Sequence, residues 1–205
     1  MTKRSPIALA VLAMLYEAPM HPYRMQRLIK ERGKDLVINV AQRASLYQTI
    51  QRLERDGLIR ARKTQRDEGR PERTIYEIAA EGREILMDWM RNILSTPLAE
   101  YPEFPAAVSF LALLTPDDAM RQFERRADAF RSAIAGLDRN LAEAAPSVPR
   151  LFLLEAEYMR AVQMAELAWV TSVIDDLRAG RLTWDEAWLR EVAARFSPGP
   201  AGGAE

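Results

Sequence analysis

Residues 44–59 (ASLYQTIQRLERDGLI) carry the side chains whose types and spacing best fit a chemical task. Leu46, Ile50 and Leu53 recur at helical spacing, which predicts one buried helix face. The other side begins with amides, hydroxyls and arginine but no acid. Glutamine suits adenine, arginine suits guanine and Ser or Thr accepts several bases, whereas phosphate mostly repels an acid. We predict a DNA-reading face made of Gln42, Arg43, Ser45, Tyr47, Gln48, Thr49 and Arg52. The alternative is an ordinary amphipathic helix whose wet side begins without acids.

A second basic group follows in two short strand-like runs, LIRARKT and ERTIYEIA, on either side of a polar tip. The pattern predicts a β-hairpin. Its arginines and lysine would contact phosphate or enter the minor groove as a wing. The predicted contacts are Arg62, Lys63, Arg66, Arg70 and Arg73. The alternative is a solvated ribbon whose charged edges prevent aggregation.

Local signals place helices around these groups. Ser5-Pro6 starts a helix that runs to about Glu17, and Pro22 starts a second that ends near Gly33. Asn39 begins a capping-box pattern for the third helix, which Gly57 and Leu58 end in a Schellman stop. A fourth helix follows the hairpin over about 80–94. Three helices, a hairpin and a fourth helix are the order of a winged helix-turn-helix.

The sequence pattern changes after the proline-rich segment 95–105, where strand-like runs end and long helical patterns begin. Apolar residues alternate in steps of three and four from Met120 to Ala144, a coiled-coil period. A second long apolar helix follows, and Thr183 to Glu186 form a capping box for a short last helix. The predicted dimerisation residues are Met120, Phe123, Phe130, Ile134, Leu137, Leu141, Tyr158 and Val162. A helical hairpin closed within one chain is the alternative.

The overall composition limits the chemistry. Zero net charge divides into 18 basic and 12 acidic residues over 1–94, against 11 and 17 over 95–205, which favours a polyanion partner for the first half. The chain has no cysteine and one histidine, His21, and it lacks a glycine-rich phosphate loop. We therefore expect no enzyme activity, no cofactor and no metal site. No apolar run reaches the length of a membrane span, which favours a cytoplasmic location.

The chain resembles the PadR family of transcriptional regulators. The resemblance rests on HPYRM at 21–25, SLYQTIQRLERDGLI at 45–59 and GRPERTIYEIAAEGRE at 69–84. EFPAAVSFLALL and LFLLEAEYMRAVQMAELAW resemble the longer PadR type less specifically. It implies a mainly α protein with a winged helix-turn-helix over 1–96, an antiparallel long-helix dimerisation domain over 103–196 and a disordered tail over 197–205.

The resemblance further implies a homodimer that binds an inverted repeat, usually as a repressor. Relatives respond to small aromatic or drug-like ligands, so Trp169, Trp184 and Trp188 are candidates for a ligand pocket, although aromatics at helical spacing are more often core. The chain departs from the family at Pro22, at Gln42-Arg43-Ala44 and at Ala79, where a capping threonine is usual. A winged-helix adaptor dimer that binds protein instead of DNA is the competing function.

Overall fold

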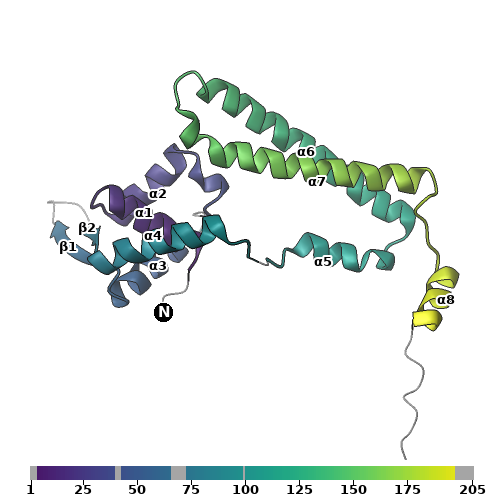
Figure 1. The fold of residues 1–205 in the computed structure, drawn as a ribbon, viewed down its shortest axis with the longest axis horizontal. Helices are drawn as coiled ribbons and strands as arrows, with labels where there is room; N and C mark the ends of the chain where they lie inside the picture. Colours follow the sequence, from purple (N-terminus) through teal and green to yellow (C-terminus); the bar gives the residue numbers. More distant parts are fainter. Residues whose placement is uncertain (1–3, 40–42, 66–72, 99, 197–205) are drawn as a thin grey trace, which may run out of the picture. The chain divides into compact units, whose positions relative to one another are not determined.

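The computed structural model describes residues 4–39, 43–65, 73–98 and 100–196, which divide into two compact units at Glu100/Tyr101 (Figure 1). The first unit contains α1 (Pro6–Glu17), α2 (Pro22–Glu31), the short 3-10 helix η1 (Lys34–Leu36) and α3 (Arg43–Arg55). It continues with β1 (Ile59–Gln65), β2 (Arg73–Ile78) and α4 (Ala80–Ser95). This order confirms the predicted winged helix-turn-helix.

Helix α1 forms the centre of the first unit. It is apolar on nearly every side, which is typical of a helix surrounded by other elements, and α3, α4 and β2 pack against it. Ser5 caps its start by accepting the amide hydrogen of Ala8 on Oγ at 3.2 Å. The largest fully buried side chains of this core are Val11, Leu12, Leu15, Met25, Ile29, Leu46, Ile50, Leu53 and Ile59.

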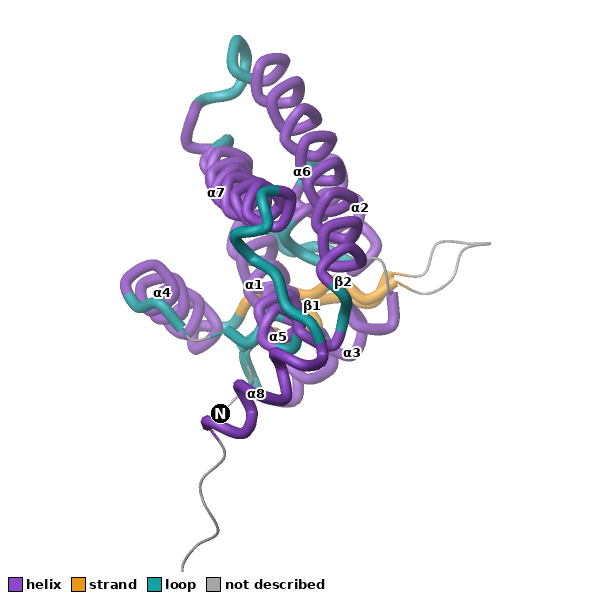
Figure 2. The backbone as a smooth tube through the Cα atoms, turned by 90° about the vertical axis from the view of Figure 1, so that its right-hand side faces the viewer, coloured by secondary structure: helices purple, strands orange, loops and turns teal. Residues whose placement is uncertain are grey.

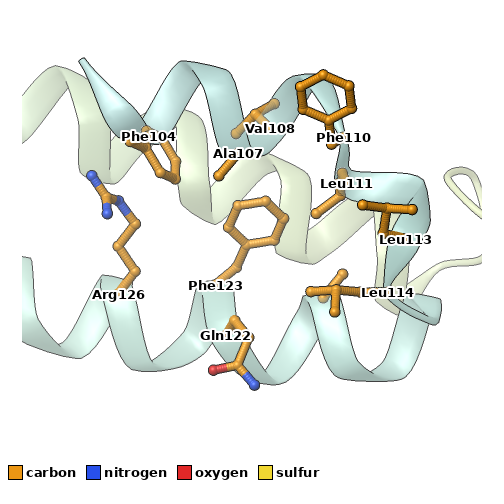
Figure 3. Close-up of a pocket in the computed structure, with 11 residues that line it drawn as sticks. Phe104, Ala107, Val108, Phe110, Leu111, Leu113, Leu114, Gln122, Phe123 and Arg126 are labelled. Carbon is orange, nitrogen blue, oxygen red and sulfur yellow. The ribbon is translucent and has the colours of Figure 1, made fainter.

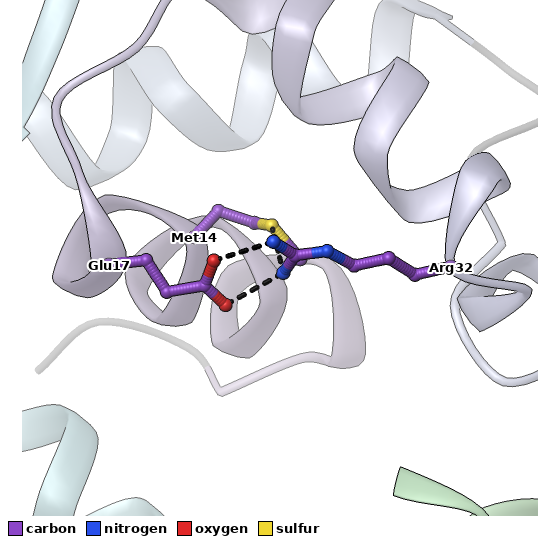
Figure 4. Close-up of polar contacts among 3 residues, drawn as sticks. All are labelled: Met14, Glu17 and Arg32. Atoms are coloured by element: carbon purple, nitrogen blue, oxygen red, sulfur yellow. Dashed lines mark hydrogen bonds and ion pairs between the residues drawn. The ribbon is translucent and has the colours of Figure 1, made fainter. Parts of the chain in front are cut away.

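An ion pair connects the last turn of α1 to the end of α2 (Figure 4). Arg32 donates from both terminal nitrogens to the two carboxylate oxygens of Glu17, at 2.7 and 2.8 Å, and approaches the Met14 sulfur at 3.7 Å. The hydrogen bonds from Arg32 hold the pKa of Glu17 below its ordinary value. Both side chains are largely exposed, so we expect the pair to orient the helices more than to stabilise them.

The predicted stop of α3 is confirmed. Gly57 has a left-handed backbone with φ of 74°. Its amide donates to the carbonyl of Glu54, and the Leu58 amide donates to the carbonyl of Leu53, each at 2.9 Å. These two bonds are those of a Schellman motif. Leu53 and Leu58 are both buried, so the turn anchors the start of β1 to the core.

The two strands form an antiparallel hairpin (Figure 2). Ala61 pairs with Tyr76 and Lys63 with Ile75, so Arg62 occupies a β-bulge. The residues before α2 extend this sheet: Met20 and Tyr76 exchange backbone hydrogen bonds at 3.0 and 3.1 Å. The sequence pattern did not predict this third pairing, which ties the wing to the helix-turn-helix.

Helix α4 begins without a side-chain cap. Ala79 occupies the cap position with extended backbone angles but has no side-chain oxygen to bond the first amides. Replacing Ala79 with serine is therefore expected to raise the free energy of unfolding by about 1 kcal/mol. Chemical denaturation followed by circular dichroism measures the change. Ala80→Ser, one residue inside the helix, serves as the control, and equal stability of the two variants would contradict the capping argument.

The second unit contains α5 (Glu103–Ser109), η2 (Leu111–Leu113), α6 (Pro116–Ala144), η3 (Arg150–Phe152), α7 (Leu154–Arg178) and α8 (Glu186–Phe196). Helices α6 and α7 lie side by side as an antiparallel hairpin (Figure 1). Ion pairs join the two helices, and their order reflects the antiparallel arrangement: residues later in α6 pair with residues earlier in α7. The pairs are Glu124 with Arg178, Arg126 with Glu166, and Asp138 with Arg160.

The cap of α8 differs from the predicted one. Asp185, rather than Thr183, accepts the backbone hydrogens of α8: its carboxylate bonds the Trp188 amide at 2.7 Å and its carbonyl bonds the Leu189 amide at 2.9 Å. The capping-box prediction was therefore wrong by two residues. An acid can replace Thr as a cap, and sequence spacing alone does not distinguish them. Within the described residues, no helix is long and apolar enough to cross a membrane.

Candidate nucleic-acid interface

The outward face of α3 is the centre of the candidate interface. Leu46, Ile50 and Leu53 are buried, as predicted, and hold the helix against the core. The exposed positions follow one another at helical spacing: Ala44, Tyr47, Gln48, Gln51 and Arg55. Gln48 lies in the middle of this face. Its amide can both donate to and accept from a base edge, as adenine recognition requires.

Two predicted contacts occupy other places on the helix. Thr49 is 7% exposed and its side chain belongs to the core side, so the prediction that it faces outward was wrong. The reason is geometric: residue 49 follows Leu46 by three positions and precedes Leu53 by four, which puts it on the buried stripe. Ser45 and Arg52 are half-buried and flank the outward face.

Arg52 has an unusual environment. Its Nε and one terminal nitrogen are shielded from solvent and find no hydrogen-bond acceptor among the residues that the structure describes. A shielded guanidinium nitrogen without an acceptor costs free energy. Because protein atoms cover these two nitrogens, a phosphate or base oxygen would reach them only if the Arg52 side chain turned outward from the edge of α3.

Gln51 and Arg55 were missed by the sequence interpretation. Both are exposed and continue the face of Gln48 towards the end of α3. Their helical spacing from Gln48, three and seven residues, could have revealed them. Arg55 lies 3.6 Å from the carboxylate of Asp56, so part of its charge is already compensated.

His21 and Tyr23 mark the start of α2. The His21 Nδ1 accepts the amide hydrogen of Arg24 at 3.1 Å, which makes it a helix cap, and its ring stacks on Tyr23 with centroids 6.1 Å apart. His21 therefore has a structural role at the start of α2. Tyr23, Arg24 and Arg27 are exposed on α2 and provide hydrogen-bond donors beside those of α3.

Two arginines of β1, Arg60 and Arg62, share one acid. Glu77 on β2 accepts from Arg60 Nε at 2.7 Å and lies 3.6 Å from Arg62 Nε. Two cations around one carboxylate leave a net positive charge on this edge, and Arg62 is exposed at the bulge. Lys63 and Arg73 lie in the strands, and Arg43 opens α3. Gln42, Arg66 and Arg70 lie outside the described residues.

The predicted dimerisation residues divide into two groups. Phe123 and Leu137 are buried within their own chain, and Met120, Phe130, Ile134 and Leu141 are half-buried along α6, as the hairpin alternative expects. By contrast, Tyr158 and Val162 are 70% and 45% exposed on α7. Exposed apolar side chains that could contact a second copy therefore lie on α7 more than on the coiled-coil stripe of α6.

The three candidate pocket tryptophans have different surroundings. Trp169 contacts Phe104 and Phe123 edge to face and lines a cavity with Phe104 and Arg126. Trp184 packs against the core of the second unit and donates from Nε1 to the Leu114 carbonyl at 2.8 Å. Trp188 is half-exposed on α8. The structure thus supports Trp169 as a cavity residue and gives Trp184 a structural role.

The fold and the face of α3 define a winged helix-turn-helix protein of the DNA-binding class. Residues 11–88 match the model of the transcriptional regulator PadR-like family. This part of the chain belongs to that family. A comparison with curated proteins gives no match.

Solved structures of PadR regulators share the fold over both units. The chain is similar to Bacillus subtilis PadR in complex with operator DNA, with 19% identity, 83% of this chain and 98% of that chain covered, and a TM-score of 0.65. It is similar to the same protein in complex with p-coumaric acid, with 18% identity, 85% of this chain and 99% of that chain covered, and a TM-score of 0.67. It is also similar to the Vibrio cholerae virulence activator AphA, with 19% identity, 84% of this chain and 98% of that chain covered, and a TM-score of 0.64.

Proposed function

We propose that this PadR-family regulator binds DNA sequence-specifically and represses transcription from an inverted-repeat operator. The observation that carries the proposal is the outward face of α3, where Tyr47, Gln48 and Gln51 are exposed and no acid interrupts the face. Arg52, with two nitrogens lacking an acceptor in the described part of the unit, adds a donor at its edge. A protein with a similar fold has been solved in complex with operator DNA, which supports DNA binding by this chain.

The second part of the proposal is a homodimer. Leu154, Tyr158, Val162 and Trp169 recur in steps of four, four and seven on α7 and are 43–70% exposed. Exposed apolar residues in one stripe are typical of a surface that meets a partner. A two-fold axis would place the two α3 helices about one DNA turn, ~34 Å, apart. Sedimentation at micromolar concentration tests this, and a single-chain mass would contradict it.

A selection from random duplex DNA, followed by sequencing, tests the proposal most directly. We expect an enriched palindromic motif, because a symmetric dimer presents the same face to both half-sites. Failure to bind any duplex in dilute buffer would instead favour a protein-binding adaptor. We also propose that a small aromatic ligand releases the operator, for which the complex of a similar protein with p-coumaric acid gives support.

The salt dependence of binding tests the role of the wing. Affinity should fall with salt at a slope of about −0.9 per phosphate contacted. Arg62→Gln is expected to lower the slope by about 0.9, because one phosphate contact is lost. Arg91→Gln is the matched control, since Arg91 is an exposed arginine of α4 that pairs with Asp88. Equal slopes for the two variants would remove Arg62 from the interface.

A further inference from the structure

The last helix, α8, has an apolar face that its own chain leaves uncovered. Trp188, Leu189, Val192 and Phe196 follow one another in steps of one, three and four, which places them on one side of the helix. Among the described residues of α8, 186–196, none is buried, and Trp188 and Phe196 are 50% and 81% exposed. A short amphipathic helix gains most of its stability by packing this face on an apolar surface.

An open groove of about 470 Å³ lies in the same unit, between α5, η2 and the first turns of α6 (Figure 3). Its walls include the apolar side chains of Val108, Leu111 and Phe123. Phe110 and Leu113, which also line it, are 68% and 85% exposed. Grooves of this kind bind amphipathic helices whose anchor residues are spaced by three, four and seven positions, and the apolar face of α8 has this spacing.

The polar groups of both surfaces pair within the chain. On α8 the ion pairs join residues four positions apart: Glu186 with Arg190, and Glu191 with Arg195. At the groove, Arg126 donates to Glu166 at 3.0 Å and Gln122 donates to Asp118 at 2.9 Å. Apolar side chains are therefore the main feature that each surface presents to a partner.

Within one chain the two surfaces remain exposed although they are close in the fold. Trp184 donates from Nε1 to the Leu114 carbonyl at 2.8 Å, which fixes the segment before α8 at the end of η2. Asp185 then caps α8 by accepting the Trp188 amide hydrogen at 2.7 Å. From this start the helix leaves both its own apolar face and the rim of the groove uncovered. The chain thus has a helix and a groove that match each other and are both available to a second molecule.

The groove also adjoins the surface proposed above for a second copy. Trp169, at the end of the exposed stripe of α7, contacts Phe104 edge to face with ring centroids 5.9 Å apart. Phe104 lines both the groove and the neighbouring cavity at Trp169. A second copy that covers the stripe would therefore lie next to the groove, and its own α8 is the apolar helix that it brings.

We propose that two copies of the chain exchange α8, so that the apolar face of each α8 lies in the groove between α5, η2 and α6 of the other copy. The exchange rests on the homodimer proposed above, and two-fold symmetry makes the contact twice. Each aromatic side chain that becomes covered buries roughly 150–250 Å². Each copy contributes Trp188, Phe196 and Phe110, which together with the α7 stripe approach the ~800 Å² per partner of a standard interface.

Cysteine cross-linking of the full chain tests the exchange, because the sequence has no cysteine of its own. One preparation carries Val192→Cys on the apolar face of α8, and the other carries Ala107→Cys, which lines the groove from α5 (Figure 3). The two are mixed, left to exchange subunits and treated with a bismaleimide shorter than the ~10 Å diameter of a helix. We expect mass spectrometry to detect peptides that join residue 192 of one variant to residue 107 of the other.

Arg190→Cys is the matched control because Arg190 lies on the opposite side of α8, where it pairs with Glu186. The yield with Val192→Cys should exceed that with Arg190→Cys by about fivefold or more, since the control residue is separated from the groove by the ~10 Å width of the helix. Equal yields, or no cross-link, in a chain that sediments as a dimer would overturn the exchange and leave the homodimer intact. A chain that sediments as a single unit would contradict both. A cross-link confined to single chains of the double variant Ala107→Cys/Val192→Cys would show that α8 occupies its own groove, which also overturns the exchange.

Phe196→Ser tests the same contact without a cross-linker. The dissociation constant of the dimer is expected to rise about tenfold or more, because a large aromatic anchor is lost from the interface. Thermal unfolding followed by circular dichroism should change little, since Phe196 is exposed in its own chain. Arg190→Ser is the control and should leave the dissociation constant unchanged. The same dissociation constant for Phe196→Ser and the unmodified chain would exclude the face of α8 from the interface.

Discussion

Replacing Gly82 with alanine is expected to destabilise the first unit by about 3 kcal/mol or more. A Cβ at this position would lie 2.0 Å from the Leu58 carbonyl oxygen and 3.0 Å from the Ile78 side chain. The nearest atom is backbone, so no side-chain rotation can relieve the contact. The same carbonyl accepts the Ala79 amide hydrogen at 3.0 Å, so moving it also disturbs the start of α4.

Hydrogen–deuterium exchange is the appropriate measurement because it reports on each unit separately. Exchange should accelerate in α1, α3 and α4 of the Gly82→Ala variant and remain unchanged in α6 and α7. Gly136→Ala is the control: its Cβ would meet nothing closer than the Arg139 guanidinium at 4.0 Å. Alanine there should stabilise α6 by about 0.5–1 kcal/mol through its helix preference. Similar stability of the two variants would contradict the close-contact argument.

The contrast between the two glycines shows what sequence patterns omit. Both lie inside helices, and helix preference alone predicts that alanine improves each of them. Only the carbonyl of Leu58, brought against α4 by the fold, distinguishes Gly82. The β-bridge between Met20 and Tyr76 is missing from the sequence interpretation for the same reason, since the segment around Met20 shows no strand pattern and only the fold brings it beside β2.

Local signals, in contrast, were sufficient at several helix ends. Ser5 caps α1 and Gly57 ends α3 as predicted, because each bond involves residues within a few positions in the chain. The apolar period also identified the buried side of α3. It did not place Thr49, because a hydroxyl residue beside a buried stripe can face either way until neighbouring elements pack against it.

The same limit applies to the candidate sites. Residue types along α3 indicated the interface, and helical spacing could have added Gln51, but only the structure showed the unsatisfied nitrogens of Arg52. The groove between α5, η2 and α6 had no sequence signal, because its lining comes from three separate elements. The heptad pattern of α6 alone does not say whether its apolar stripe packs on a helix of the same chain or on a second copy. The structure packs this stripe on α7 of the same chain.

Gln48→Ala is expected to cost about 1–3 kcal/mol of DNA binding on the preferred operator, or roughly 5- to 150-fold in affinity. Gln48 is exposed at the centre of the outward face of α3. It carries no charge, so the salt slope should stay the same, unlike that of Arg62→Gln. The loss should concentrate at one base pair in each half-site and should vanish on DNA mutated at that pair. Arg43→Ala is expected to cost a similar amount at a different base pair.

Thr49→Val is the informative control for Gln48→Ala because the two residues are neighbours on the same helix. Thr49 is buried, so its change should leave the base preference intact. Binding competition against every single-base variant of the selected operator measures the base preference of both variants. If Gln48→Ala weakens all sequences equally, its amide contacts only the sugar-phosphate backbone, and the outward face of α3 positions the protein without reading the bases.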